Sequence, residues 1–142
     1  MIALNQIEVI SVQYHKSRHA AYLLHAHIVF VTKYRRKVLA ELHHEAFARA
    51  ARQVCQEAGA TLEECNGEAD HVHLLVNYPP TVQLTKLINS LKAVTSRRLR
   101  QEFADLAGAY SKPVLWSRAY FVSSCGGASL DVIKAYIQNQ QG

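Results

Sequence analysis

The sequence predicts an α+β protein with a ferredoxin-like βαββαβ arrangement, in which two helices cover one face of an antiparallel sheet. Three of the four predicted strands are rich in β-branched, leucine and aromatic residues, and two longer segments repeat apolar residues at helical spacing. The two kinds of segment follow each other in the order that this arrangement requires. With 142 residues, 49% of them hydrophobic and 19% charged, the chain has the size and composition of one globular domain over 1–142.

The first half of the chain contains the first two core strands and the first helix. Residues 1–20 have little pattern, and we interpret them as a variable N-terminal segment with a short strand at 7–12. A strongly β-prone run predicts the first core strand at 22–32. Apolar residues at helical spacing predict a helix over 41–58, and the second core strand follows at 60–65.

The second half contains the other two core strands and two more helices. A short apolar run that includes two histidines predicts a buried strand over 70–77, which lies next to the first core strand in this topology. Pro79-Pro80 ends this strand. The remaining elements are expected to be a helix over 81–103 with Thr81 as its N-cap, a loop over 104–112, a strand over 114–123 and a terminal helix over 129–140.

Composition narrows the class of partner and the compartment. The net charge of +5 and a pI of about 9.2 favour a polyanionic partner, of which nucleic acid is the commonest. The sequence has no apolar run of membrane-spanning length and no signal-peptide pattern, so we expect a soluble, cytoplasmic protein without a membrane partner. The three cysteines show no CxxC spacing and are expected to be reduced thiols.

Two His-x-His pairs lie on neighbouring predicted strands. Because side chains alternate between the faces of a strand, His71 and His73 point the same way, and so do His25 and His27. Two imidazoles on one face of a strand can hold one divalent metal ion. The ordinary alternative is that these histidines bond to backbone groups. The two pairs have the same spacing, and the residues alone do not choose between them.

The predicted terminal helix offers further candidates. Tyr136 and Gln140 are four residues apart and share one helical face. A hard cation such as Mg²⁺ or Mn²⁺ also takes oxygen ligands, and the phosphate oxygens of a substrate can supply some. A tyrosine hydroxyl can attack a phosphodiester when a nearby metal ion stabilises the developing charge, which gives a covalent phosphotyrosine. The alternatives are that Tyr136 packs against the sheet and that Gln140 is solvated at the helix end.

Basic residues form two clusters that suit a nucleic-acid partner. One lies on a single arc of the helix over 81–103, and the other follows the first core strand and includes Tyr34 as a stacking surface. The ordinary alternative is a solvated helix face and a solvated loop. The candidates for contact with a DNA backbone are Lys33, Arg35, Arg36, Lys86, Arg97 and Arg100.

Four stretches together resemble the single-tyrosine HUH transposases encoded by the smallest bacterial and archaeal insertion sequences. The matching stretches are 22–39, 70–76 with Pro79-Pro80 after it, 115–121 and 133–140. No single stretch is decisive, but four in the right order over nearly the whole chain are a specific signal.

The resemblance implies a fold, a reaction and a set of partners. Members of this family act on single-stranded DNA, recognise hairpins at the transposon ends, and cleave and rejoin strands through 5′-phosphotyrosine intermediates. They are homodimers whose sheets merge, and an active site can combine the histidines of one subunit with the tyrosine of the other. The resemblance assigns His71, His73 and Gln140 as ligands of Mg²⁺ or Mn²⁺, Tyr136 as the nucleophile, and Gly126 and Gly127 as the hinge before the tyrosine helix.

Three other functions use the same fold. An HUH nickase that initiates replication would share the chemistry, although 142 residues leave no room for a helicase domain. A non-catalytic module would bind RNA or DNA on its sheet and would need neither Tyr136 nor the histidine pairs. A metal-dependent RNA-processing nuclease would form no covalent adduct with DNA.

Overall fold

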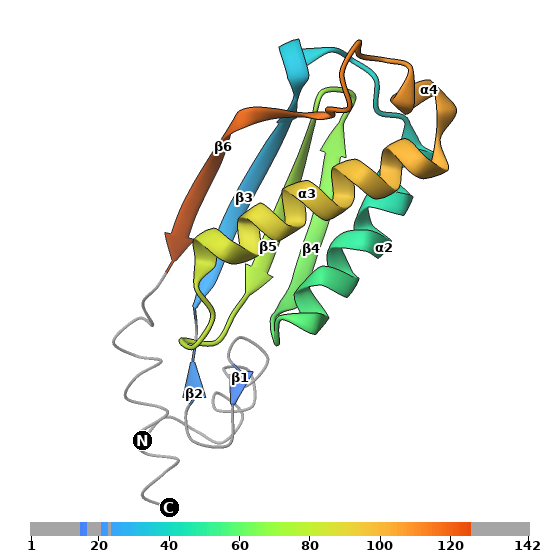
Figure 1. Cartoon of the computed structure of the whole chain (residues 1–142). Helices are drawn as coiled ribbons and strands as arrows, with labels where there is room; N and C mark the ends of the chain where they lie inside the picture. Colours follow the sequence, from blue (N-terminus) through green and yellow to red (C-terminus); the bar gives the residue numbers. More distant parts are fainter. Residues whose placement is uncertain (1–14, 17–20, 23, 126–142) are drawn as a thin grey trace, which may run out of the picture.

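A computed structural model describes residues 15–16, 21–22 and 24–125 (Figure 1). The predicted strand at 7–12 and the predicted helix over 129–140 lie outside these residues. The elements in chain order are β1 (His15–Lys16), β2 (Ala21–Tyr22), β3 (His25–Thr32), the 3₁₀ turn η1 (Lys33–Arg35), α2 (Glu41–Glu57), β4 (Thr61–Glu68), β5 (His71–Asn77), α3 (Leu84–Glu102), α4 (Ala104–Ala107) and β6 (Trp116–Cys125).

The four long strands form one antiparallel sheet in the order β4-β5-β3-β6. This is the order of the ferredoxin-like arrangement, and β3 and β5 are the central neighbours, as predicted. Helices α2 and α3 lie side by side across one face of the sheet, and the other face carries no helix from the described part of the chain (Figure 1). The predicted α+β fold class is confirmed.

The core lies between the sheet and the two helices. Burial alternates along β3 and β5, so that every second residue of each strand points toward the helices. The rings of Phe30, Phe47 and Trp116 meet there, with centroids 5.5 to 6.4 Å apart. Each fully buried apolar side chain of this size contributes about 1.5–3 kcal/mol to stability. This packing holds the two central strands rigidly and fixes the side chains on the opposite face.

Several element boundaries differ from prediction. The helix expected from Thr81 begins at Leu84, because the N–H of Val82 bonds to the carbonyl of Pro79 in a turn that delays the first helical bond. The strand expected to end at residue 65 continues to Glu68 and pairs with β5 from Thr61 to Glu68, with a register shift between Leu62 and Glu64. The first core strand, expected over 22–32, begins at His25.

Two features of the segment before β6 were also predicted wrongly. The expected loop over 104–112 contains the short helix α4, and β6 begins at Trp116 instead of residue 114.

The helix predicted over 41–58 is confirmed as α2. It ends before Gly59, which has a φ of +79°.

Two remaining sequence predictions concern membranes and thiols. No helix in the described ranges is both long enough and apolar enough to span a bilayer.

Cys55 and Cys65 are free thiols, as predicted, and burial raises the pKa of each to about 11. Both therefore stay protonated at neutral pH.

Candidate metal and nucleic-acid site

The candidate site lies on the face of the sheet that α2 and α3 leave open. On β3 the partly exposed side chains are those of His25, His27 and the two alternate residues that follow them, and on β5 they include His71 and His73. The register places Val29 opposite His73 and Val31 opposite His71. The two histidines of each motif therefore share a face, as their spacing predicts, and the register puts both motifs on the same side of the sheet.

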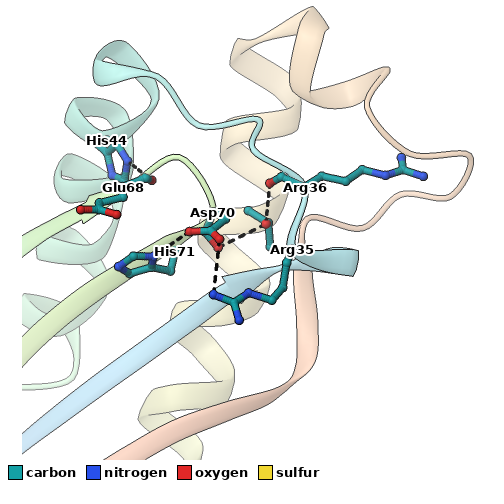
Figure 2. Close-up of polar contacts among 7 residues, drawn as sticks. Arg35, Arg36, His44, Glu68, Asp70 and His71 are labelled. Atoms are coloured by element: carbon teal, nitrogen blue, oxygen red, sulfur yellow. Dashed lines mark hydrogen bonds and ion pairs between the residues drawn. The ribbon is translucent and has the colours of Figure 1, made fainter.

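His71 and His73 are neighbours on this face. Their ring centroids are 4.8 Å apart, with the planes nearly perpendicular. The Nδ1 atom of His71 is 2.8 Å from Oδ1 of Asp70. Figure 2 shows the Asp70 carboxylate between the His71 ring and the Arg35 guanidinium, whose nearest nitrogen is 3.5 Å from Oδ2. These contacts leave the Nε2 atom of His71 available to a ligand.

Asp70 keeps its negative charge in this position. The hydrogen bond with His71 and the nearby Arg35 guanidinium hold the pKa of the Asp70 carboxyl below its usual value. An ionised carboxylate accepts the Nδ1–H of His71, which fixes the ring tautomer in which Nε2 has a free lone pair. A metal-binding histidine needs that tautomer.

His73 is held in a parallel way by another histidine. Its Nδ1 atom is 3.2 Å from Nε2 of His27, and the two rings stack with centroids 5.4 Å apart. Partial burial, with smaller contributions from His71 and His27, lowers the pKa of His73 and favours its neutral form. Only a neutral imidazole can bind a metal ion, so this environment suits a ligand.

The donor atoms fit a divalent ion in part. Two Nε2 atoms on adjacent rings can share one ion, and Mg²⁺ or Mn²⁺ then takes oxygen ligands for the rest of its shell. Within 24–125 and the two short strands before them, no three His, Cys, Asp or Glu side chains gather as a ready-made metal site. The predicted ligand Gln140, the predicted nucleophile Tyr136 and the predicted hinge Gly126 and Gly127 lie outside the described residues.

The rival pair does not form an equivalent site. His27 pairs with His73 rather than with His25. The Nε2 atom of His25 is buried and has no hydrogen-bond partner in the described part of the chain. The structure thus brings together three imidazoles, from His27, His71 and His73.

The basic turn after β3 lies close to this face. Tyr34 and Arg35 adopt left-handed φ values of 60° and 52°, which non-glycine residues rarely do. This conformation leaves the Tyr34 ring 73% exposed, with Lys33 Nζ and Arg36 Cζ each 5.4 Å from its centroid. An exposed aromatic ring between two cations is a surface on which a nucleotide base can stack.

The basic residues on α3 do not form one cluster. Arg97 and Arg100 line a cavity of about 480 Å³ together with Lys92 and the segment from Pro113 to Trp116. Lys86 instead lines a separate cavity against α2. The sequence predicted one arc for these three residues, and the structure divides them between two cavities that different elements border.

Sequence reasoning missed two residues and one contact of these surfaces. Asp70 immediately precedes the His-x-His motif, so its position next to His71 was visible in the sequence. The pairing of His27 with His73 depends on strand register, which local patterns do not give. Lys92 lines the cavity with Arg97 and Arg100, and its ammonium group donates a hydrogen bond to the Arg118 carbonyl at 2.8 Å.

Known transposase sequences match most of this chain. Residues 20–140 match the family described as "Transposase IS200 like". The transposase for insertion sequence element IS200 of Salmonella typhimurium is 32% identical over 114 residues, which cover 80% of this chain and 74% of that protein. The ISDra2 transposase TnpA of Deinococcus radiodurans is 24% identical over 132 residues, covering 93% of this chain and 94% of that protein.

Solved structures agree in fold. The crystal structure of a Deinococcus radiodurans R1 protein assigned as a transposase has a TM-score of 0.70 and 28% sequence identity, and it covers 89% of this chain and 97% of that one. A REP-associated tyrosine transposase bound to a REP hairpin has a TM-score of 0.55 and 11% identity, covering 88% of this chain and 67% of that one. At 11% identity, the second structure shows a shared fold alone.

Proposed function

The chain belongs to the IS200-like transposase family, and from this premise we propose a metal-dependent transposase that acts on single-stranded DNA. It recognises hairpins at transposon ends, cleaves through a 5′-phosphotyrosine intermediate and rejoins the strands. The observation that most supports this proposal is the pair His71 and His73, whose Nδ1 atoms both have partners while both Nε2 atoms remain available.

The proposed metal ligands are His71, His73 and Gln140. Two neutral nitrogens and one amide oxygen leave coordination positions for water and phosphate oxygens, which suits Mg²⁺ or Mn²⁺. When bound, the ion supplies positive charge that offsets the negative charge developing on the phosphate. Asp70 contributes by holding His71 in the tautomer that this role requires.

Tyr136 is the proposed nucleophile. Its hydroxyl oxygen bonds to phosphorus as the bond from phosphorus to the 3′ oxygen of the preceding nucleotide breaks. The phenol loses its proton, the leaving 3′ oxygen gains one, and the DNA 5′ end becomes a phosphotyrosine. Because one ester replaces another, the step is reversible without ATP, and another 3′ hydroxyl can attack to rejoin strands. Gly126 and Gly127 would allow the segment that carries Tyr136 to move between these steps.

The DNA partner is proposed from charge and from one structural neighbour. The REP-associated tyrosine transposase is bound to a hairpin, and this chain shares its fold. Lys33 and Arg36 lie against the ring of the exposed Tyr34. Arg35 contacts Asp70 beside the histidine face, which places a cation near the proposed reaction. Arg97 and Arg100 with Lys92 offer a second surface for the phosphate backbone.

A homodimer is proposed from the free edge of the sheet. Strand β6 pairs with β3 on one side and has no neighbour on the other among the described strands. Phe121 and Val122 in this strand are 58% and 39% exposed, which is unusual for large apolar side chains on an edge strand. A second copy that extends the sheet would cover them, and its active sites could combine histidines and tyrosine from different subunits.

The nucleophile is tested with Tyr136→Phe, which removes one hydroxyl. Incubated with Mg²⁺ and a 3′-labelled, hairpin-bearing single strand, the full chain should cleave and form a labelled covalent adduct, and the Tyr136 peptide should carry it. The Phe variant should bind the same DNA with unchanged affinity but give no adduct. Tyr120→Phe, which removes a phenol hydroxyl from β6, serves as the matched control and should cleave normally.

Two results would contradict the nucleophile assignment. Cleavage by the Phe variant would remove Tyr136 from the reaction. Binding without cleavage by both the wild type and the variant would favour the non-catalytic module.

The groove on α3 is tested with the double variant Arg97→Ala/Arg100→Ala. Each lost phosphate contact should reduce the slope of log affinity against log salt by about 0.7 to 0.9, and binding should weaken across all sequences alike. Arg98→Ala, which removes a cation of α3 whose guanidinium donates to the Gln53 side chain on α2, is the matched control and should change the slope less. An unchanged slope in the double variant would remove this groove from the DNA surface.

A further inference from the structure

We propose that His27 is a positioning residue for His73. Its Nε2 atom accepts a hydrogen bond from the Nδ1–H of His73 and so leaves the Nε2 lone pair of His73 for the metal ion. The inference rests on the metal role proposed above for His73. It goes further because it assigns a function to a residue of the other His-x-His motif.

The geometry of the two central strands sets this contact. His27 lies opposite Leu75, and His73 lies opposite Val29, so the two histidines are diagonal neighbours on the same face of an antiparallel pair. Their nitrogens are 3.2 Å apart, and their rings stack with an angle of 16° between planes. Both strands are paired on both sides, and their buried faces pack against the helices, so the sheet fixes the separation of the two rings.

The hydrogen bond decides which nitrogen of His73 is free. A neutral imidazole has one N–H donor and one acceptor nitrogen. When Nδ1 carries the proton and donates it to His27, the Nε2 lone pair of His73 points away from this bond. The opposite tautomer would place the proton on Nε2, where it would block an ion.

Asp70 and His27 thus have parallel roles. The Asp70 carboxylate accepts from His71 at 2.8 Å, and the His27 imidazole accepts from His73 at 3.2 Å. Metal-binding histidines almost always donate their second N–H to such an acceptor, because it orients the ring and raises its basicity. Together the two acceptors present the same nitrogen, Nε2, from both rings.

The contact borders a cavity. His27 and His73 line a cavity of about 190 Å³ on the open face, together with Glu64, Asn66 and the backbone neighbours of His73. His25, two residues away on the same strand and face, has a buried Nε2 atom without a partner in the described residues. His25 is therefore a matched control for removing a ring from β3.

The first experiment measures Mn²⁺ binding to the full-length protein without DNA by isothermal titration calorimetry. His27→Phe keeps a ring but removes the acceptor, and we expect affinity to fall about 10- to 100-fold. His27→Gln offers an amide oxygen as acceptor and should retain affinity within a few-fold of wild type. His25→Phe should bind as the wild type does, and His73→Ala gives the reference for loss of the ligand.

The second experiment reads the tautomer of His73 directly, in the metal-free protein, from long-range ¹H–¹⁵N correlations. The wild type and His27→Gln should show the Nδ1–H form, and His27→Phe should shift His73 toward the Nε2–H form. Unchanged affinity and tautomer in His27→Phe would overturn the role of His27. Equal weakening in the Phe and Gln variants would also overturn it, because the ring itself would then matter instead of the acceptor.

A third outcome separates this inference from the function on which it rests. A wild-type protein that takes up no Mn²⁺ would overturn the metal role of His71 and His73, and the role of His27 with it. Normal Mn²⁺ binding by the wild type with no effect of His27→Phe would overturn only the role of His27.

Discussion

The two His-x-His motifs have the same spacing and face the same side of the sheet, yet their surroundings differ. In the motif on β5, each ring has its Nδ1 atom engaged, by Asp70 for His71 and by His27 for His73. In the motif on β3, the Nε2 atom of His25 is buried and has no hydrogen-bond partner among the described residues. Spacing decides which face a histidine occupies, but its neighbours decide which nitrogen is free.

The difference extends to the residues opposite each motif. His25 lies across from Asn77, whose side chain is 1% exposed and whose amide nitrogen and oxygen both lack partners within the described ranges. A buried polar group without a partner costs about 1–3 kcal/mol of stability. One end of the open face therefore has oriented donors with partners, and the other has buried polar atoms without partners among the described residues.

The largest expected difference between the motifs is in catalysis. His71→Ala should reduce DNA cleavage by about 10³-fold or more, because losing the ion removes several kcal/mol of charge stabilisation in the transition state. Affinity for hairpin DNA, measured by fluorescence anisotropy, should stay nearly unchanged. His25→Ala, the matched change in the other motif, should cleave within a few-fold of wild type.

Either of two results would break this comparison. Equal loss of cleavage in His25→Ala would make the two motifs functionally equivalent. Loss of DNA binding in His71→Ala to the same degree as cleavage would indicate a structural role for His71.

A smaller effect is expected from Asp70→Asn, which removes the charge but keeps the shape. A hydrogen bond to a charged acceptor is about twice as strong as a neutral one, so the His71 tautomer becomes less firmly held. Mn²⁺ affinity measured by calorimetry should fall about tenfold. Asp105→Asn is a matched control, since Asp105 contacts His43 at 3.1 Å outside the open face, and it should leave the affinity unchanged.

Sequence patterns predicted the parts of this molecule that depend on local periodicity. Alternation along each strand predicted that the two histidines of a pair share a face, and the order of apolar segments predicted the sheet topology correctly. Helix α2 was predicted to within one residue at its end, since apolar spacing and Gly59 both mark it. These features need no information about distant contacts.

The parts that sequence patterns missed depend on distant contacts or on turns. Contact between His27 and His73 follows from the register of two strands that are 46 residues apart. Lys86 separates from Arg97 because different elements pack on the two sides of α3. The strand β4 continues through Gly67, where a side chain would lie 2.2 Å from the His71 carbonyl, so this glycine permits close approach of strands rather than ending one.

The smallest expected effect is on stability, at the end of the open face that holds His25. Asn77→Leu replaces a buried amide without partners among the described residues by an apolar side chain of similar size. Removing the unsatisfied groups should raise the free energy of unfolding by about 1 kcal/mol, measured by urea denaturation, and leave Mn²⁺ affinity unchanged. Asn77→Asp is the control, and it should destabilise the protein because it buries an unpaired charge. Destabilisation by Asn77→Leu would contradict the prediction and show that the amide is bonded beyond the described residues. The polar groups at this end of the open face would then have hydrogen-bond partners, as those at the end with His71 do.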